Sequence, residues 1–234
     1  MKSLDEIIIY KDDNIVILNK PSSLLSQKDG SNEVSLEDYV QDYFNNKNAR
    51  LINRLDKDTT GLIVFGLNEP TIKYFNEVFS NHEKVEKKYL TLVSGQITEK
   101  GEVNAPIRKN FQMKKMVVTS EKNGGKKALT LYNPIKVFDD STLLEVTLKT
   151  GRTHQIRVHM SYIRHHVIGD YKYGDFKINN KYKSEFGLTS QFLHSFSLTF
   201  NCLEGKYKYL NGKIFEAKMP ENFFDVLTSK GYSL

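Results

Sequence analysis

Apolar residues along the chain fall mostly into short runs, which predicts a protein built from strands with a few helices. Residues 7–10 and 15–19 are two such runs, and the turn-rich tripeptide Asp12-Asp13-Asn14 separates them, so we expect a pair of strands. Further strand candidates, apolar or alternating in pattern, are residues 62–67, 88–93, 142–148 and 191–200.

Three segments carry the spacing of an amphipathic helix. Ser35 begins the first, with Asp38 as the acid of a capping box. Its stripe, which we interpret as core packing rather than as a platform for bases, is Leu36, Tyr39, Val40, Tyr43 and Phe44. The second is a short helix with Ile72, Phe75 and Phe79 on one face, and the third is a closing helix after Pro220. We expect one α+β domain over residues 1–234.

Composition narrows the possible functions. With 234 residues, 39% of them hydrophobic, the chain can bury a sizeable core. Its 34 Lys and Arg against 28 Asp and Glu give a net charge of +6, which suits a polyanionic partner. A solvated, lysine-rich surface without any such partner would have the same composition.

The positive charge is concentrated between residues 108 and 127. Seven basic residues in this segment face a single acid, Glu121, and Gly124-Gly125 lies among them. We interpret the segment as a protruding basic loop or hairpin that follows phosphates, and a flexible solvated loop is the alternative.

Several classes of protein are not indicated. The N-terminus lacks the apolar core of a signal peptide, and no apolar run approaches the roughly 20 residues of a membrane span, so we expect a soluble, cytoplasmic protein. Cys202 is the single cysteine, and we expect it to be a small buried apolar residue. The histidines lack the spacing of a metal site, and no phosphate-binding glycine loop or dinucleotide fingerprint is present, so we expect no metal and no cofactor.

Two segments carry candidate chemistry. Residues 52–61 form an acidic, hydroxyl-rich loop directly before a buried strand, where Asp56 could act as a catalytic carboxylate. Residues 150–159 predict a strand, a turn and the start of a helix, with His154 and Arg157 three positions apart on one face. Such a donor-rich surface suits a carboxylate or a phosphate. An exposed polar helix would be the alternative if this segment stood alone.

These segments resemble signatures of the RluA-type pseudouridine synthases. The first matches the pattern Arg-Leu-Asp-x-x-x-Thr-Gly-Leu through Arg54, Leu55, Asp56, Thr60, Gly61 and Leu62. The second is the run from Gly151 to His159, and a third is Lys87-Lys88-Tyr89-Leu90. Weaker similarities follow in family order, namely Asn19-Lys20-Pro21-Ser22, residues 125–130, Gly169-Asp170, Tyr173-Gly174 and Leu193-His194.

The resemblance implies an α+β fold with a central mixed, largely antiparallel sheet, flanking helices and a catalytic cleft. It implies one catalytic domain without the appended N-terminal RNA-binding module of some relatives. The reaction would convert uridine in ribosomal or transfer RNA to pseudouridine, with Asp56 as the catalytic group, Arg157 as its ion-pair partner and Tyr89 against the base. Candidate RNA-binding residues are Arg54, which would enter the space of the extruded base, and Thr60, Arg152, Lys114 and Lys115.

Some questions stay open at this stage. Asn53 and His166 depart from the family pattern, and we expect the first to change hydrogen bonds in its loop and the second to loosen a turn. Asp58 is interpreted as a loop carboxylate bonded to nearby backbone or to Thr59 and Thr60. A non-catalytic RNA-binding or RNA-folding factor on the same scaffold is the alternative function, and a glycosidase is a more distant one. We expect a monomer whose partner is RNA, with no membrane association.

Overall fold

The computed structural model describes residues 3–232, and the chain divides into two compact units. The first comprises residues 1–87 and 195–219, and the second comprises residues 88–194 and 220–234. Strands β5 (Val85–Ser94) and β11 (Leu193–Phe200) each run from one unit into the other. That residues 1–234 act as one catalytic domain stays a prediction.

Antiparallel strands form the centre of the first unit. β2 (Ile15–Lys20) pairs with β1 (Ile8–Lys11) on one side and with β4 (Thr60–Gly66) on the other. β3 (Arg50–Leu51) pairs with β4, and β12 (Ile214–Glu216) pairs with β11. The strands expected at residues 7–10, 15–19 and 62–67 are therefore confirmed, although Ile7 ends a short helix, α1 (Leu4–Ile7).

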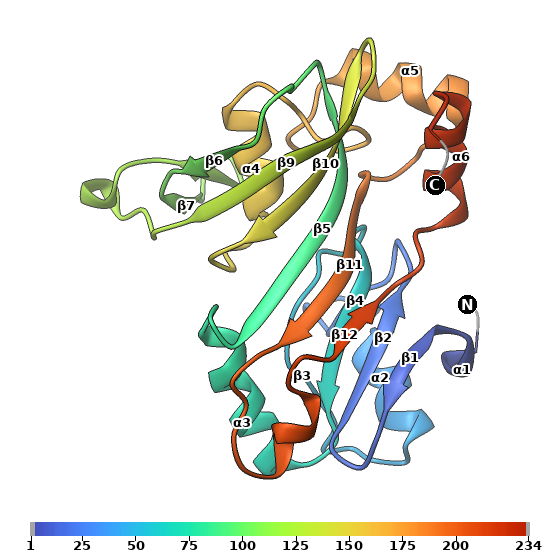
Figure 1. Ribbon diagram of the computed structural model, residues 1–234, viewed down its shortest axis with the longest axis vertical. Helices are drawn as coiled ribbons and strands as arrows, with labels where there is room; N and C mark the ends of the chain where they lie inside the picture. The colour runs from blue at the N-terminus through green and yellow to red at the C-terminus, as the bar shows by residue number, and fades with distance from the viewer. Residues whose placement is uncertain (1–2, 233–234) are drawn as a thin grey trace. The chain divides into compact units, whose positions relative to one another are not determined.

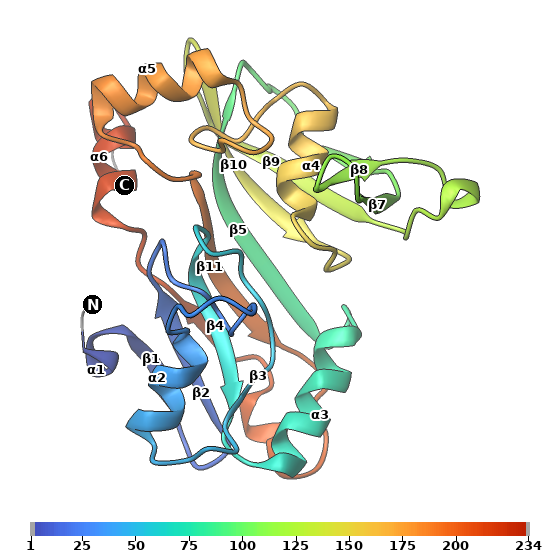
Figure 2. The ribbon, with the colours of Figure 1, turned by 180° about the vertical axis from the view of Figure 1, so that it is seen from behind.

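Helices complete the first unit. They are α2 (Leu36–Tyr43), α3 (Glu69–Ser80) and the 3-10 helix η2 (Gly205–Leu210). α2 lies behind β2 and β4 in Figure 1 and in front of them in Figure 2, so it covers one face of these strands. Every residue of β4 is buried, which explains why the strand reads as a continuous apolar run rather than an alternating one.

The helix that begins after Ser35 carries one confirmed expectation and one error. Ser35 and Asp38 form the reciprocal capping box. Leu36 and Val40 are buried, but Tyr39 and Tyr43 are 36% and 39% exposed, so the aromatic stripe is not core packing throughout. The helix is only eight residues long, and both tyrosine rings lie at the side of its buried face, where solvent reaches them. There the Tyr43 hydroxyl donates to Asp5.

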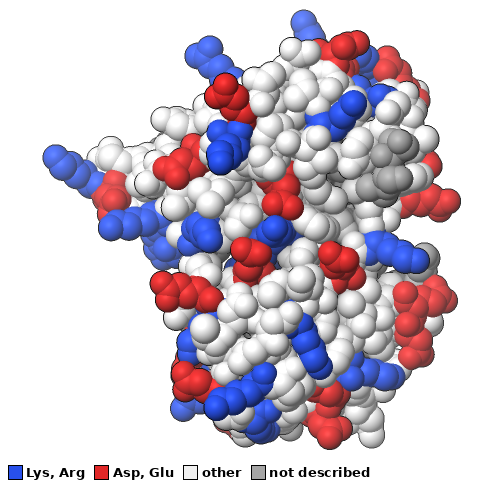
Figure 3. Space-filling model, in the orientation of Figure 1, with Lys and Arg blue, Asp and Glu red and all other residues white. Residues whose placement is uncertain are grey.

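The second unit holds an antiparallel sheet of its own and a separate hairpin. β10 (Ser141–Leu148) pairs with β5 and with β9 (Leu129–Val137), which pairs with β6 (Gly101–Asn104). The hairpin consists of β7 (Ile107–Asn110) and β8 (Lys115–Val118), followed by the 3-10 turn η1 (Glu121–Asn123). The strands expected at residues 88–93 and 142–148 and the basic hairpin are confirmed. In Figure 3, Lys and Arg side chains gather over the projecting segment that carries the hairpin.

Three helices surround this sheet. They are α4 (Gln155–Tyr162), α5 (Phe176–Phe186) and the closing α6 (Glu221–Ser229). α4 lies behind β9 and β10 in Figure 1 and in front of them in Figure 2, so it covers one face of the two strands. The predicted strand–turn–helix around residue 150 and the closing helix after Pro220 are both confirmed.

An ion cluster fastens the C-terminal helix to the second unit. Asp140, in the turn between β9 and β10, accepts Lys181 Nζ at 3.0 Å and Lys230 Nζ at 2.6 Å. Burial works to raise the pKa of the Asp140 carboxyl, but hydrogen bonds from Lys230 and Lys181 outweigh it and lower that pKa. Nearby, the Phe223 ring stacks on Phe192 with 4.1 Å between centroids, which buries the apolar face of α6.

The single cysteine corrects one expectation. Cys202 is exposed, not buried. It lies after the end of β11 with a φ of 54°, in a bend that leaves its side chain at the surface while Leu203, the next residue, is buried. Within residues 3–232, no helix combines the length and the apolarity that a membrane crossing needs.

Candidate active site

Asp56 lies in the loop between β3 and β4, in the first unit. Its side chain is partly buried, and its carbonyl oxygen accepts a hydrogen bond from the Thr59 amide at 3.0 Å, which closes a tight turn. At the start of the loop, Asn53 Oδ1 accepts the Val64 amide of β4 at 2.7 Å. Asn53, which was expected to change the hydrogen bonds of this loop relative to the family pattern, thus links the loop to a buried strand.

Lys20 anchors the same loop from beneath. The side chain is fully buried at the end of β2, and its Nζ donates to three carbonyl oxygens, those of Pro21 at 2.9 Å, Leu24 at 2.8 Å and Lys57 at 2.7 Å. Three acceptors use all the donors of an ammonium group. The lysine thus links the backbone of Lys57, next to Asp56, to the loop that follows β2.

Charge around Lys20 links it to the carboxylates of the loop. Burial lowers the pKa of Lys20 to about 7, while the negative charges of Asp58 and Asp56 act in the opposite direction. The buried ammonium of Lys20 and these two carboxylates therefore attract one another. Sequence reasoning noted Lys20 only as part of a weak motif, because a lysine's burial depends on loops distant along the chain.

Two serines of the loop that follows β2 contact the residues on either side of Asp56. Ser26 Oγ donates to the Leu55 carbonyl at 2.7 Å and accepts the Leu55 amide at 3.3 Å. Ser23 Oγ donates to Asp58 Oδ1 at 3.4 Å, a partner that was not expected, and the expected bonds of Asp58 to nearby backbone or to Thr59 and Thr60 stay a prediction. Lysine and serines together fix the backbone on both sides of Asp56.

Gly61 is dictated by close packing. Its φ is +106°, and a Cβ at this position would lie 2.2 Å from the Ser195 carbonyl oxygen. Such a contact is sterically impossible without backbone movement, and the left-handed conformation disfavours other residues as well. The glycine of the Thr-Gly-Leu motif therefore allows β4 to begin directly against the backbone of residue 195.

The start of α4, where the second predicted motif lies, belongs to the second unit. His154 precedes the helix in a left-handed conformation, with a φ of 55°, so it does not share a helical face with Arg157 as expected. Gln155 is buried: its side chain accepts from Thr150 Oγ1 and the Arg152 amide and donates to Thr130 Oγ1 and the Leu129 carbonyl. The helix is largely buried, which removes the alternative of an exposed polar helix.

Arg157 forms a two-pronged ion pair with Asp170. Its Nε donates to Oδ2 at 2.7 Å and its Nη2 to Oδ1 at 2.8 Å, and the Asp170 side chain is fully buried. The amides of Lys172 and Tyr173 donate to the same carboxylate. The guanidinium is thereby held in one orientation. The expected partner Asp56 lies in the other unit, and that pairing stays a prediction.

Tyr173 connects the hairpin, α4 and the loop that follows it. Its hydroxyl lies 2.7 Å from His154 Nδ1 and accepts the Met116 amide at 2.9 Å. The Arg157 guanidinium lies 5.1 Å from the ring centroid, within cation–π range. Sequence reasoning gave Asp170 and Tyr173 no role, although both belong to motifs that it noted.

The remaining candidates are placed as follows. Tyr89 is 6% exposed on β5, opposite Val146 of β10, and Thr60 is buried at the start of β4. Arg54 and Arg152 are exposed, and Arg152 Nε donates to the Lys127 carbonyl at 3.0 Å. The catalytic and RNA-binding roles of these residues stay predictions.

Two histidines have clear structural roles. His159 is fully buried between Thr130 Oγ1 at 2.8 Å and the Ala105 carbonyl at 2.9 Å, and burial lowers its pKa. The His166 amide donates to Ser94 Oγ at 2.9 Å, a bond that a proline could not make, and the loosening expected of this turn stays a prediction. Among residues 3–232, no three His, Cys, Asp or Glu side chains are placed to hold a metal ion.

Comparison with known proteins identifies the family. The family described as RNA pseudouridylate synthase matches residues 14–162. The tRNA pseudouridine synthase C of Haemophilus ducreyi is 31% identical over 207 residues, which cover 82% of this chain and 84% of the relative. The ribosomal large subunit pseudouridine synthase D of Blochmanniella floridana is 35% identical over 204 residues, 83% of this chain, but the match spans only 60% of that relative.

A solved structure agrees. Human RNA pseudouridylate synthase domain containing 4 superposes with a TM-score of 0.78 at 25% identity, over 100% of this chain and 96% of the human one. The α+β fold with a mixed, mostly antiparallel central sheet and flanking helices is thus that of a pseudouridine synthase. The chain belongs to the RluA-type family of RNA pseudouridine synthases, the isomerases that convert uridine in RNA to pseudouridine.

Proposed function

We propose that this enzyme isomerises specific uridines of ribosomal or transfer RNA, with Asp56 as its essential catalytic group. The observation that carries the proposal is the bracing of the Asp56 turn, in which Lys20 donates to the Lys57 carbonyl and Ser26 binds Leu55. A catalytic group must be held within a fraction of an ångström of its working position. A solvated loop acid without a catalytic role would not need such support.

Asp56 would act at the sugar. As a nucleophile, its carboxylate attacks C1′ while the bond from C1′ to uracil N1 breaks, giving a glycosyl ester and a uracil anion. The uracil then turns, and C5 attacks C1′ and displaces the carboxylate. Loss of the C5 proton and protonation of N1 complete the isomerisation without any net gain or loss of atoms. Deprotonation of the ribose by Asp56 is the other possible first step.

Arg157 and Tyr89 would serve this carboxylate and the base. Arg157 is held in its orientation by the bidentate contact with Asp170. A nearby cation keeps a partly buried carboxylate ionised. Tyr89, buried at the β5–β10 pairing, would pack against the uracil and take the C5 proton.

Extrusion of the target base requires further contacts with RNA. Unstacking costs roughly a few kcal/mol. The exposed Arg54, two residues before Asp56, would fill the space that the base leaves. Thr60 and Arg152 would contribute near the two motifs, and Lys114 and Lys115 of the hairpin would contact phosphates.

The RNA target follows from the relatives only in outline. One is named for transfer RNA and others for the large ribosomal subunit, so both RNA classes belong to the proposal. We further propose that the enzyme acts as a monomer, and in the cytoplasm, where both RNA classes are found.

The test is pseudouridine mapping of total RNA from cells that lack the protein. We expect at least one site to disappear, wild-type protein and the Asp58→Ala variant to restore it, and Asp56→Ala to fail. Asp58 is the matched control because it lies in the same loop and is also partly buried. Restoration by Asp56→Ala would refute the catalytic role. A map that does not change in the deletion strain would favour the alternative, a non-catalytic RNA-binding or RNA-folding factor.

A further inference from the structure

A groove in the second unit lies between the β7–β8 hairpin and α4. It has a volume of about 370 Å³, within the range of sites for small ligands. The hairpin contributes Met113 and residues 115–118, the helix contributes Val158, Ser161 and Tyr162, and the loop after residue 170 contributes Lys172, Tyr173 and Gly174. Arg157 and Tyr89 do not line it, although Tyr173, one of its walls, lies against the Arg157 guanidinium.

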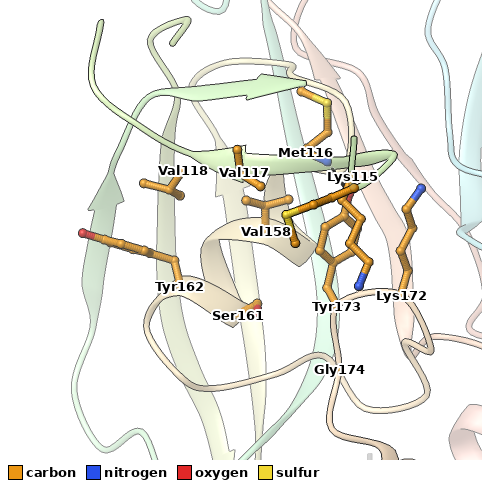
Figure 4. A pocket seen from close by; sticks show the side chains of 11 residues that line it. Lys115, Met116, Val117, Val118, Val158, Ser161, Tyr162, Lys172, Tyr173 and Gly174 are labelled. Carbon is orange, nitrogen blue, oxygen red and sulfur yellow. Dashed lines mark hydrogen bonds between the residues drawn. The ribbon is translucent and has the colours of Figure 1, made fainter. Parts of the chain in front are cut away.

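The middle of the groove is apolar. Figure 4 shows Val117 and Val118 above Val158, with Tyr162 at one end. Tyr162 and Met113 are each 59% exposed, which is unusual for large apolar side chains that line one depression. An exposed apolar surface of this kind is typical of a binding site.

The other end of the groove is cationic. Lys115 Nζ and Lys172 Nζ lie 5.8 and 6.0 Å from the centroid of the Tyr173 ring, and Figure 4 shows both lysines beside that ring. Within the described part of the chain, residues 3–232, neither lysine forms an ion pair with a carboxylate. Two neighbouring unneutralised cations favour an anionic group between them.

Hydrogen bonds to the Tyr173 hydroxyl link the walls of the groove. The Tyr173 hydroxyl accepts the Met116 amide, which fastens β8 to the loop on the opposite side. His154 Nδ1 lies 2.7 Å from the same hydroxyl. The walls are therefore linked by hydrogen bonds before any ligand enters, and a preformed site loses little entropy on binding.

We propose that this groove binds one unpaired nucleotide of the substrate RNA, other than the target uridine. The base lies on the valines and stacks on Tyr162, and its phosphate lies between Lys115 and Lys172. An acidic peptide would also bind the two lysines. An apolar surface beside two neighbouring cations matches a base and its phosphate more closely. The inference rests on the proposed function only in taking RNA as the ligand.

The experiment measures binding rather than turnover. The probes are a fluorescein-labelled oligouridylate and an abasic oligomer with the same number of phosphates, both titrated by anisotropy against proteins in an Asp56→Ala background. We expect Tyr162→Ala to weaken binding of the oligouridylate by about 5-fold or more and to leave the abasic oligomer unaffected. Tyr162→Phe, which keeps the ring, should bind like the parent protein.

Controls separate base contacts from charge and from folding. Tyr39→Ala removes an exposed tyrosine from the other unit and should change neither affinity. Lys172→Gln should weaken both probes equally, because each carries the phosphates. Equal loss of both probes in Tyr162→Ala, or no loss of either, would overturn the proposal.

A second measurement does not depend on substitutions. An oligomer with 4-thiouridine in place of uridine is irradiated on the same protein, and the crosslinked peptides are identified by mass spectrometry. Crosslinks to peptides that contain Met113 or Tyr162 are expected, and crosslinks confined to other peptides would contradict the site. The mapping experiment on Asp56 can fail while this binding holds, and the reverse is equally possible.

Discussion

Arg157 and Asp170 form a buried, bidentate ion pair that joins α4 to the loop thirteen residues later. Burial works to raise the pKa of the Asp170 carboxyl, but the hydrogen bonds and charge of Arg157 outweigh it and hold that pKa below the usual value. The pair fixes the orientation of the Arg157 guanidinium, for which we propose a role toward Asp56.

Asp170→Asn should destabilise the protein strongly. The substitution removes the charge of Asp170 from the buried Arg157, and breaking such a pair costs about 3–5 kcal/mol. Denaturant unfolding followed by circular dichroism measures the change. Asp139→Asn, an exposed acid in the β9–β10 turn, is the control and should stay within about 0.5 kcal/mol of wild type. Equal stability of the two variants would show that the pair contributes little.

Acid should unfold the protein through Asp140 and Asp170. The pKa values of both carboxyls are lower in the folded protein than the ordinary 3.8, so the unfolded chain binds more protons as the pH falls. Their stabilisation is complete above about pH 5 and is lost progressively below it. Unfolding free energies measured from pH 7 to pH 3 should therefore fall less steeply in a variant with both Asp140→Asn and Asp170→Asn. Parallel curves would assign the acid sensitivity to other groups.

Lys20→Met should impair both stability and turnover. Each of the three carbonyl groups that lose their donor costs about 1–3 kcal/mol when left buried and unpaired. If the loop shifts Asp56 by about 1 Å, turnover should drop by about 10²-fold. Lys73→Met, on the exposed face of α3, is the matched control and should keep wild-type kinetics. Unimpaired turnover in a folded Lys20→Met protein would exclude a positioning role.

Gly61→Ala should cost more than Gly124→Ala. Both glycines have positive φ, which costs an alanine about 1–2 kcal/mol, but only at Gly61 would the new Cβ meet a backbone atom, the Ser195 oxygen at 2.2 Å. Nothing lies within 4 Å at Gly124. The difference between the two unfolding free energies isolates the close approach, and a difference near zero would mean that β4 shifts at little cost.

Lys114→Gln should flatten the salt dependence of RNA binding. Each phosphate contact contributes about 0.7 to the slope of log affinity against log salt for a single strand. We expect a loss of that size in the variant, measured by anisotropy over a salt series. Lys73→Gln should leave the slope unchanged, and the same slope in both variants would remove Lys114 from the RNA interface.

Local sequence patterns predicted where helices and strands form better than they predicted which residues are buried. The capping box at Ser35, the buried β4 and the turn into α4 all follow from neighbouring residues, and all were confirmed. The exposure of Tyr39 and Cys202 was not predicted, because burial depends on which distant segments cover a residue.

The candidate site divides in the same way. The Asp56 loop and the His154 to Arg157 segment could be found from motifs. The buried ammonium of Lys20 and the Asp170 partner of Arg157 could not, because each is defined by contacts between segments more than ten residues apart. The expectation that His154 and Arg157 share a helical face was wrong. His154 precedes the first turn and has a left-handed backbone, so helical spacing does not apply to it.

The interleaving of the two units has a consequence for synthesis on the ribosome. The first unit includes residues 195–219, and the second includes residues 220–234, so neither is a continuous segment. β4 begins against the backbone of Ser195, and this contact cannot form until most of the chain has been made. The loop that carries Asp56 precedes β4, so a nascent chain should acquire the packed form of this loop only after residue 195 has left the ribosome, and removal of residues 195–234 should affect both units.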